Sequence, residues 1–163
     1  MKESSNLLLK QLSMLVMQLN DHSYSKELPL LMDNSIGKHV RHILDLYDCL
    51  LEAVASSVLN YDQRKRNPLL ETSSQIALIK IKEIQAGIDC LKLDKELILH
   101  QSIGSSNVQM KTQTQRELLY TIDHTVHHLA IIRIAIQHHF PEISIPENFG
   151  FAFSTLRYRE KQA

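Results

Sequence analysis

Apolar residues recur at helical spacing in four stretches of the chain. The stretches cover about residues 5–20, 35–60, 72–93 and 114–139. Residues three or four positions apart share one face of a helix, so this periodicity predicts four long helices. The stretches are separated or followed by three prolines, each of which disfavours helical geometry at the residue before it: Pro29, Pro68 and Pro141.

Capping signals precede three of these helices, and those of the third helix are Thr72 and Gln75, which fit a capping box. Ser35 stands at the start of the second helix, where its hydroxyl can accept a hydrogen bond from a free backbone N–H. Thr114 and Glu117 fit a capping box at the start of the last helix, in which both side chains satisfy backbone N–H groups. These signals predict where the three helices begin.

The stretch before the last helix has no helical pattern. Its sequence is ELILHQSIGSSNVQMKTQ, in which two β-prone segments flank residues 104–107. This predicts a short hairpin or an extended excursion over residues 96–112. Because four long helices occur with no linker and no internal repeat, we expect a single all-α domain over residues 1–163. Its expected architecture is an antiparallel four-helix bundle.

The tail after the last helix is irregular in pattern but apolar. Its large apolar side chains are Phe149, Phe151, Phe153 and Leu156. Side chains of this kind are seldom left in water at a free chain end. We therefore expect residues 147–158 to pack against the bundle.

The charge balance narrows the functional classes. Lys+Arg and Asp+Glu both number 18, so the formal net charge is zero. A protein that binds nucleic acid usually carries an excess of basic charge to neutralise phosphates. A nucleic-acid partner is therefore not expected.

The cysteines and the apolar segments indicate the cellular compartment. Cys49 and Cys90 form no paired motif, which favours reduced thiols in the core over a disulfide framework. Polar residues interrupt the first apolar run, and no stretch of ~18 apolar residues occurs. We expect a cytoplasmic protein with no signal peptide and no membrane-spanning helix.

Histidine is the unusual component, with nine residues, three of them in DHTVHHLAIIRI. His124 and His128 are four positions apart on the last helix, a spacing at which two imidazoles can reach one zinc ion. Glu117, Thr121 and these two histidines form one polar stripe on a helix that is otherwise largely apolar. A buried polar stripe needs internal partners, so the pattern indicates a metal site; a stripe that faces water is the alternative.

A third ligand is expected from the second helix, which contains SIGKHVRHILDLYD. His39 lies within the apolar face of that helix, and His42 lies at its margin. Helical geometry alone leaves the choice open, with a slight preference for His39.

Other polar residues near these turns have two interpretations. Asp45 and Asp123 could accept the second N–H of a metal-bound histidine, or they could be ordinary surface acids. His127 lies beside the stripe and either supports the site or is exposed. The basic cluster at residues 64–66 is a solvated loop or an anchor for an anionic substrate. The HExxH motif is absent, so the general base of a zinc protease is missing from its usual position.

Two motifs together resemble a known family. SIGKHVRHILDLYD, followed by RELLYTIDHTVHHLAIIRI, is similar to the DinB-like (YfiT-like) superfamily of metal-binding four-helix-bundle proteins. The resemblance covers roughly residues 5–160, and NYDQRKRN and FGFAFSTLRY are similar to an uncharacterised branch of that superfamily.

The resemblance implies a ligand set. In that family one divalent metal ion is held by three histidines, one from the second helix and two from the fourth, which here correspond to His42, His124 and His128. His39 then becomes a residue that supports a ligand or faces the substrate, against the slight geometric preference.

The resemblance also implies a functional class. Characterised relatives include transferases and isomerases that use low-molecular-weight thiols. We therefore expect a metal-dependent enzyme, a thiol-dependent transferase or a hydrolase, that acts on a small molecule and forms a homodimer. Zinc suits three imidazoles, and so does nickel or another transition metal. No residue is assigned as catalytic; the alternative is a non-catalytic, stress-related bundle with a structural or adventitious metal.

Overall fold

The computed structural model describes residues 1–162 and contains the four long helices that the sequence predicts. They are α1 (Lys2–Val16), α3 (Ile36–Ser56), α5 (Ser74–Cys90) and α6 (Thr114–His139). Shorter helical segments are α2 (Asp21–Ser25), the 3₁₀ helix η1 (Pro29–Leu31), α4 (Leu69–Thr72) and α7 (Phe153–Glu160). Ser35 caps α3 as expected, because its hydroxyl accepts from the backbone N–H of Lys38 at 3.0 Å.

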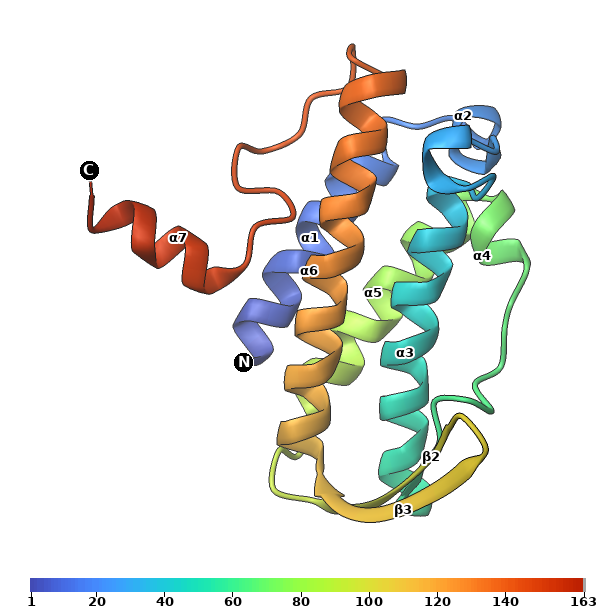
Figure 1. Ribbon diagram of the computed structural model, residues 1–163, viewed down its shortest axis with the longest axis vertical. Coiled ribbons are helices and arrows are strands. Elements are labelled where there is room, and N and C mark those ends of the chain that lie inside the picture. Colours follow the sequence, from blue (N-terminus) through green and yellow to red (C-terminus); the bar gives the residue numbers. More distant parts are fainter. Residues whose placement is uncertain (163) are drawn as a thin grey trace.

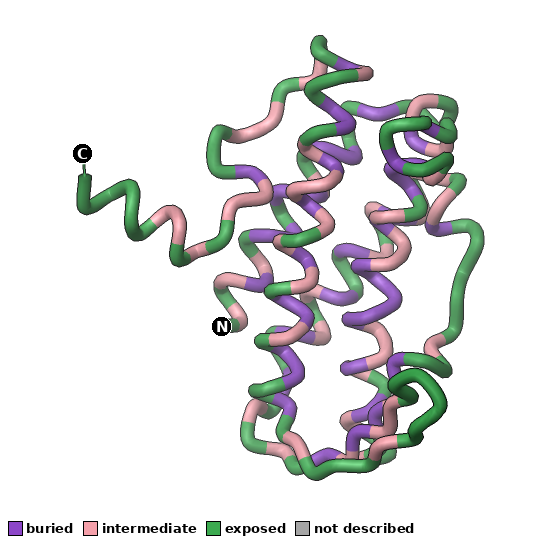
Figure 2. Tube along the Cα trace, viewed as in Figure 1, coloured by how far each residue is buried: buried purple, intermediate pink, exposed green. Residues whose placement is uncertain are grey.

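The four long helices form a bundle around one apolar core (Figure 1). α3 packs against α5 and α6, and α1 packs against the same two helices from the other side. The buried positions follow the inward faces of these helices (Figure 2). Leu12, Leu44, Ile84 and Ile132 are all completely buried, one from each helix. The periodic apolar positions therefore supply the core, as the sequence predicts.

The direction of the helices differs from the expected antiparallel bundle. α3 and α6 run in opposite directions, but α3 and α5 run in the same direction (Figure 1). The cause is the connection over residues 57–73, which returns along the outside of the bundle to α4 before α5 begins. This connection passes close to α3 and supplies part of the site described below.

The all-α expectation holds for the bundle but not for the whole chain. A three-stranded sheet, in the order β1-β2-β3, covers one end of the bundle (Figure 1). The hairpin expected at residues 96–112 is present as β2 (Glu96–Ile103) and β3 (Ser106–Gln113). The sequence missed β1 (Val58–Leu59), which pairs in parallel with β2. β1 falls inside the predicted second helix because α3 ends early, where Ser57 adopts a left-handed conformation (φ 60°, ψ 11°).

The tail expectation is confirmed at Phe149 and at Phe153, which is partly buried against the core, but is wrong for most of the terminal helix. Phe149 is fully buried against the bundle. Phe151 stacks on two guanidinium groups, those of Arg133 at 4.7 Å and Arg159 at 4.3 Å from the ring centre. α7 buries none of its residues and points away from the bundle (Figure 1).

The cysteine expectation also needs a correction. Both cysteines are free thiols, but only Cys49 is partly buried, whereas Cys90 is exposed at the end of α5. Across residues 1–162, no helix is long and apolar enough to cross a membrane.

We predict that Gly37→Ala destabilises the protein. A Cβ atom at Gly37 would overlap the backbone carbonyl of Glu71 and lie 2.8 Å from the Tyr24 ring. Neither neighbour can move freely, so the variant should lose ~1–3 kcal/mol of unfolding free energy in a urea titration.

Gly87→Ala is the matched control for this prediction. Its new Cβ would meet only the flexible side chain of Leu51, and alanine is favoured over glycine in a helix by ~1 kcal/mol. Equal stability of the two variants would contradict the close packing of α3 on α4.

Candidate metal centre

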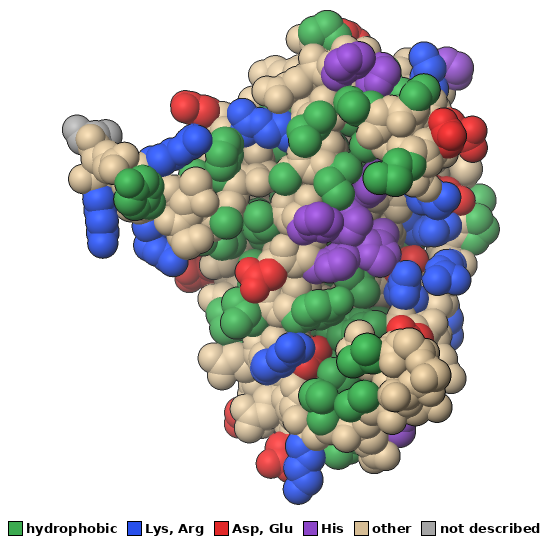
Figure 3. All heavy atoms as spheres, viewed as in Figure 1, with side chains coloured by type: hydrophobic (Ala, Val, Ile, Leu, Met, Phe, Trp, Pro, Cys, Tyr) green, Lys and Arg blue, Asp and Glu red, His purple; other side chains and the backbone are tan. Residues whose placement is uncertain are grey.

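Four imidazoles meet where α3 packs against α6, and they form a histidine patch on the surface (Figure 3). α3 brings His39 and His42, one turn apart, and α6 brings His124 and His128, also one turn apart. All four rings are half-buried because they flank the apolar faces that hold the two helices together. The stripe on α6 faces protein rather than water, because its other members are buried.

Ring nitrogens from three of these histidines converge. His124 Nε2 lies 2.8 Å from His42 Nε2 and 3.0 Å from His128 Nε2. One nitrogen from each ring lies within 4.8 Å of the other two. A tetrahedral zinc ion with bonds of about 2.0–2.1 Å holds its ligand nitrogens roughly 3.3 Å apart. The three rings therefore fit a divalent transition metal after a widening of a few tenths of an ångström.

His39 lies behind His128 rather than within this group. Its Nδ1 is 2.9 Å from His128 Nδ1, on the side of that ring that faces away from His124. Its own Nε2 is buried and has no hydrogen-bond partner among the described residues. The structure thus separates the two histidines of α3 that helical geometry left tied.

The protein environment favours the neutral form of these rings. Burial, with the neighbouring rings, lowers the pKa of His42 to about 4 and that of His128 to about 3. Burial also lowers the pKa values of His39 and His124. Neutral imidazole carries the lone pair that a metal ion needs, so at neutral pH the rings are ready to act as ligands.

A single arginine lies beside the histidines. Nη2 of Arg64 lies 3.4 Å from His42 Nδ1, and its Nη1 donates to the backbone carbonyl of Tyr61 at 2.7 Å. Arg64 is half-buried, whereas its neighbours Lys65 and Arg66 are exposed. The basic cluster therefore divides into one site residue and two solvated ones.

A buried carboxylate holds the loop that carries Arg64. Glu117 on α6 is completely buried and accepts a hydrogen bond from the Tyr61 hydroxyl at 3.0 Å. It also accepts from the Thr112 hydroxyl at 2.6 Å and from Arg116 at 3.0 Å. Tyr61 in turn holds Arg64 through its backbone carbonyl, so Glu117 positions the guanidinium through Tyr61.

This arrangement corrects the capping box expected at the start of α6. The Thr114 hydroxyl donates to the carbonyl of Lys92 at 2.6 Å, and Glu117 is engaged with Tyr61. Sequence reasoning missed Tyr61, because nothing local links it to a residue 56 positions away. The signal that could have pointed to such a partner was Glu117 itself, because it lies on the polar stripe of a largely apolar helix and therefore needs a buried donor.

The remaining candidates, Asp45, Asp123 and His127, are not part of the converging group, although the His127 ring centre lies 5.2 Å from that of His128. Asp45 is buried, and burial raises the pKa of its carboxyl to about 6; its nearest cation is Arg41 Nε at 3.6 Å. Asp123 and His127 are exposed. Within residues 1–162, no hydrogen bond joins either aspartate to a histidine nitrogen, so their role as acceptors stays a prediction.

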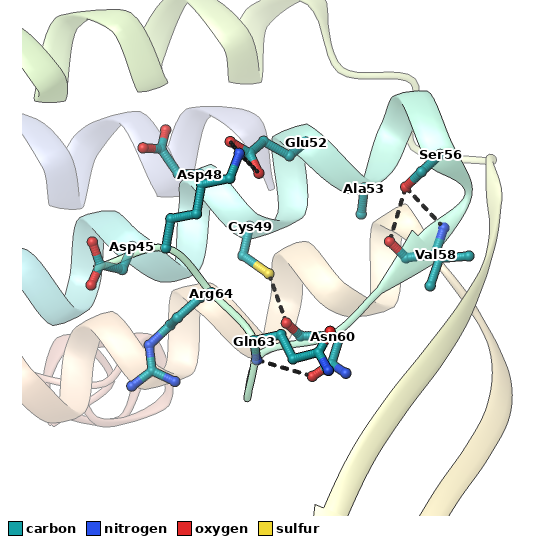
Figure 4. Close-up of a pocket in the computed structure, with 11 residues that line it drawn as sticks. Asp45, Asp48, Cys49, Glu52, Ala53, Ser56, Val58, Asn60, Gln63 and Arg64 are labelled. Atoms are coloured by element: carbon teal, nitrogen blue, oxygen red, sulfur yellow. Dashed lines mark hydrogen bonds and ion pairs between the residues drawn. The ribbon is translucent and has the colours of Figure 1, made fainter. Parts of the chain in front are cut away.

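A cavity of about 410 Å³ lies between α3 and residues 58–65 (Figure 4). Asp45 and Arg64 stand at one end of it, and Ser56 and Val58 stand at the other (Figure 4). Cys49 lines the middle, where burial raises the pKa of its thiol to about 11. The cavity begins one helical turn from the histidines, and its own thiol stays protonated at neutral pH.

Known proteins share the fold and part of the sequence. The crystal structure of a DinB-like protein (YjoA) from Bacillus subtilis superimposes with a TM-score of 0.55 and 16% identity, over 93% of each chain. The fold of this chain is therefore DinB-like. No model of a known protein family matches the sequence.

A curated relative matches part of the chain. FK506-binding protein 5 of Rhizopus delemar is 37% identical over 113 residues, which are 65% of this chain. The match spans 29% of the length of the fungal protein.

We predict that the metal-free protein loses stability as the pH falls from about 6.5 to about 4. Histidines in the unfolded chain take up protons near pH 6.5, whereas folded His42 and His128 resist until about pH 4 and 3. The unfolded state thus binds more protons in this window, which lowers the unfolding free energy. Urea titrations of chelator-treated protein between about pH 7.5 and about pH 4.5 measure the effect.

The double variant His42→Asn with His128→Asn should flatten this pH dependence. The control is His138→Asn, which changes an exposed histidine near the end of α6. An unchanged pH dependence in the double variant would show that the cluster is not its source.

Proposed function

We propose that this chain, which has the DinB-like fold, binds one divalent transition-metal ion through His42, His124 and His128 and uses it in catalysis. The observation that carries the proposal is the convergence of three ring nitrogens, one from each histidine. Within residues 1–162, the group contains no fourth histidine, cysteine or carboxylate. Three imidazoles with an open position are typical of catalytic rather than structural zinc sites.

Zinc is the ion that we propose, and nickel or another divalent transition metal also suits three imidazoles. When bound, it would supply Lewis acidity that lowers the pKa of a coordinated water or thiol. The protein residues do the rest: the α3–α6 packing holds the rings, the half-buried setting limits water, and His39 orients His128. The cavity beside His42 has room for a small molecule.

The reaction that we propose is a thiol-dependent transfer or a hydrolysis on a small-molecule substrate. The DinB-like fold, the neutral imidazoles and the adjacent cavity support it. A homodimer and a cytoplasmic location stay predictions from the sequence. We propose no FK506 binding, because the name of the fungal relative belongs to a protein of which this chain matches 29%.

A non-catalytic helical bundle with a structural or adventitious metal is the second candidate. The observation in its favour is that the four rings already pair with one another through contacts of 2.8–3.0 Å. The two candidates differ in the coordination shell, because only a catalytic site leaves a position for an added ligand.

We predict about one divalent metal ion per chain in protein purified without added metal or a histidine tag. His42→Ala, His124→Ala and His128→Ala should each lose most of it, because two imidazoles hold a transition metal far more weakly than three. His127→Ala is the control, since it removes an exposed histidine of the same helix. Elemental analysis measures the content, and full retention in His124→Ala and His128→Ala would remove the metal-site proposal.

We predict a smaller loss for His39. If His128 binds the ion through Nε2, its Nδ1 carries the proton and donates it to Nδ1 of His39, 2.9 Å away. His39→Ala should weaken metal affinity about 10–100-fold. His39→Asn should restore much of it, because its amide oxygen lies near the position of Nδ1, and His39→Gln should not.

Competition with a chromophoric chelator measures these affinities. Complete loss of metal in His39→Ala, together with retention in His42→Ala, would make His39 the ligand and reverse the assignment.

A further inference from the structure

Arg64 is a half-buried cation that forms no ion pair within residues 1–162, although the Asp45 carboxyl shares its end of the cavity. Within residues 1–162, no carboxylate oxygen lies within 4.0 Å of its guanidinium nitrogens, and its Nε is buried without a hydrogen-bond partner. Arg41, the residue before His42 on α3, is instead held by Glu71 at 2.6 Å. A partly desolvated charge without a partner is costly, so Arg64 is stabilised best when an anion joins it.

The contact between Arg64 and His42 defines a proton arrangement. A guanidinium can only donate, so His42 Nδ1, at 3.4 Å from Nη2, must offer a lone pair. The proton of neutral His42 then sits on Nε2, which lies 2.8 Å from His124 Nε2 and can donate to it. This arrangement gives both ring nitrogens of His42 a partner, as long as Nε2 does not bind a metal ion.

Metal ligation reverses this arrangement. If His42 binds an ion through Nε2, its proton must move to Nδ1, because neutral imidazole carries one proton. An N–H of His42 would then face an N–H of Arg64, and Nη2 would lose its acceptor. Nη1 keeps its bond to the Tyr61 carbonyl, so the guanidinium stays at the site. Nη2 then lacks an acceptor, as the buried Nε on the same edge of the guanidinium already does.

We propose, on the basis of the metal site proposed above, that Arg64 anchors a carboxylate group of the substrate next to the metal ion. Nε and Nη2 form the fork that matches two carboxylate oxygens. The substrate is thus a small carboxylate-bearing molecule, with its reacting group at the histidines and its carboxylate at Arg64.

The charges around the cavity support this orientation. Its α3 wall carries Asp45 at the same end as Arg64, and Asp48 and Glu52 farther along. Asp48 is paired with Lys80 at 3.3 Å, and Glu52 with Lys65 at 3.2 Å. Because Lys65, the other cation that lines the cavity, is already paired with Glu52, Arg64 is left to attract a carboxylate, at the end near the histidines.

The test uses the cobalt-loaded full chain and two small thiols, thioglycolate and mercaptoethanol, of similar length. Thioglycolate carries a carboxylate where mercaptoethanol carries a hydroxyl. The sulfur-to-cobalt charge-transfer band reports the binding of either thiol. The wild type should bind thioglycolate at least about tenfold more tightly than mercaptoethanol. Arg64→Gln should lose this preference, and Arg66→Gln, which changes an exposed arginine of the same loop, should keep it.

The affinity for zinc is a second measurement. It should change in opposite directions for an arginine that anchors the substrate and for one that only holds the loop. Arg64→Gln should bind zinc several-fold more tightly, because it removes a positive charge and a competing donor beside His42. Arg64→Lys should retain part of the thioglycolate preference, because it keeps the charge but not the fork. An arginine that only holds the loop in place would give weaker zinc binding in Arg64→Gln.

The outcomes separate this inference from the metal proposal. A chain that binds no cobalt overturns both. Cobalt binding with no band from either thiol shows a closed site and overturns the anchoring role. Cobalt binding with equal affinity for the two thiols, or a thioglycolate preference that survives in Arg64→Gln, overturns the role of Arg64 and leaves the metal site standing.

Discussion

The packing of α3 against α6 is the constraint on which the rest of this site depends. It brings two histidines from each helix face to face, so four imidazoles share one half-buried space. Desolvation keeps these rings neutral, and buried ring nitrogens need partners. In the structure the rings pair with one another, except at Nε2 of His39, which has no partner among residues 1–162. A metal ion at the three converging nitrogens would satisfy the same need with stronger bonds, at the cost of a small outward movement.

The second element of the site comes from the chain between α3 and α5. This segment crosses the end of the bundle, pairs with the sheet through β1 and then passes His42. Its position is set by a buried carboxylate: Glu117 binds Tyr61, and Tyr61 binds Arg64. Glu117 is a charged group inside an apolar core. Its burial is explained by Arg64, which it places beside the histidines through Tyr61.

The DinB-like fold is shared with a bacterial protein at 16% identity, so it tolerates wide change in sequence. Patterned apolar faces and four helices suffice for the bundle, and many sequences meet that requirement. Function is narrower, because it depends on which side chains meet at the α3–α6 contact.

The sequence by itself determined the four helices, the hairpin and the pair His124–His128, because each depends on spacing within one element. It could not choose between His39 and His42, since one lies within the apolar face of the helix and the other at the margin of the same face. Which of them meets the α6 pair depends on the rotation and shift of two packed helices. Tyr61 and Arg64 were equally hidden, because a loop acquires its position only from the elements that it crosses. The parallel course of α3 and α5 and the outward course of α7 were decided the same way, by long-range packing that no local pattern encodes.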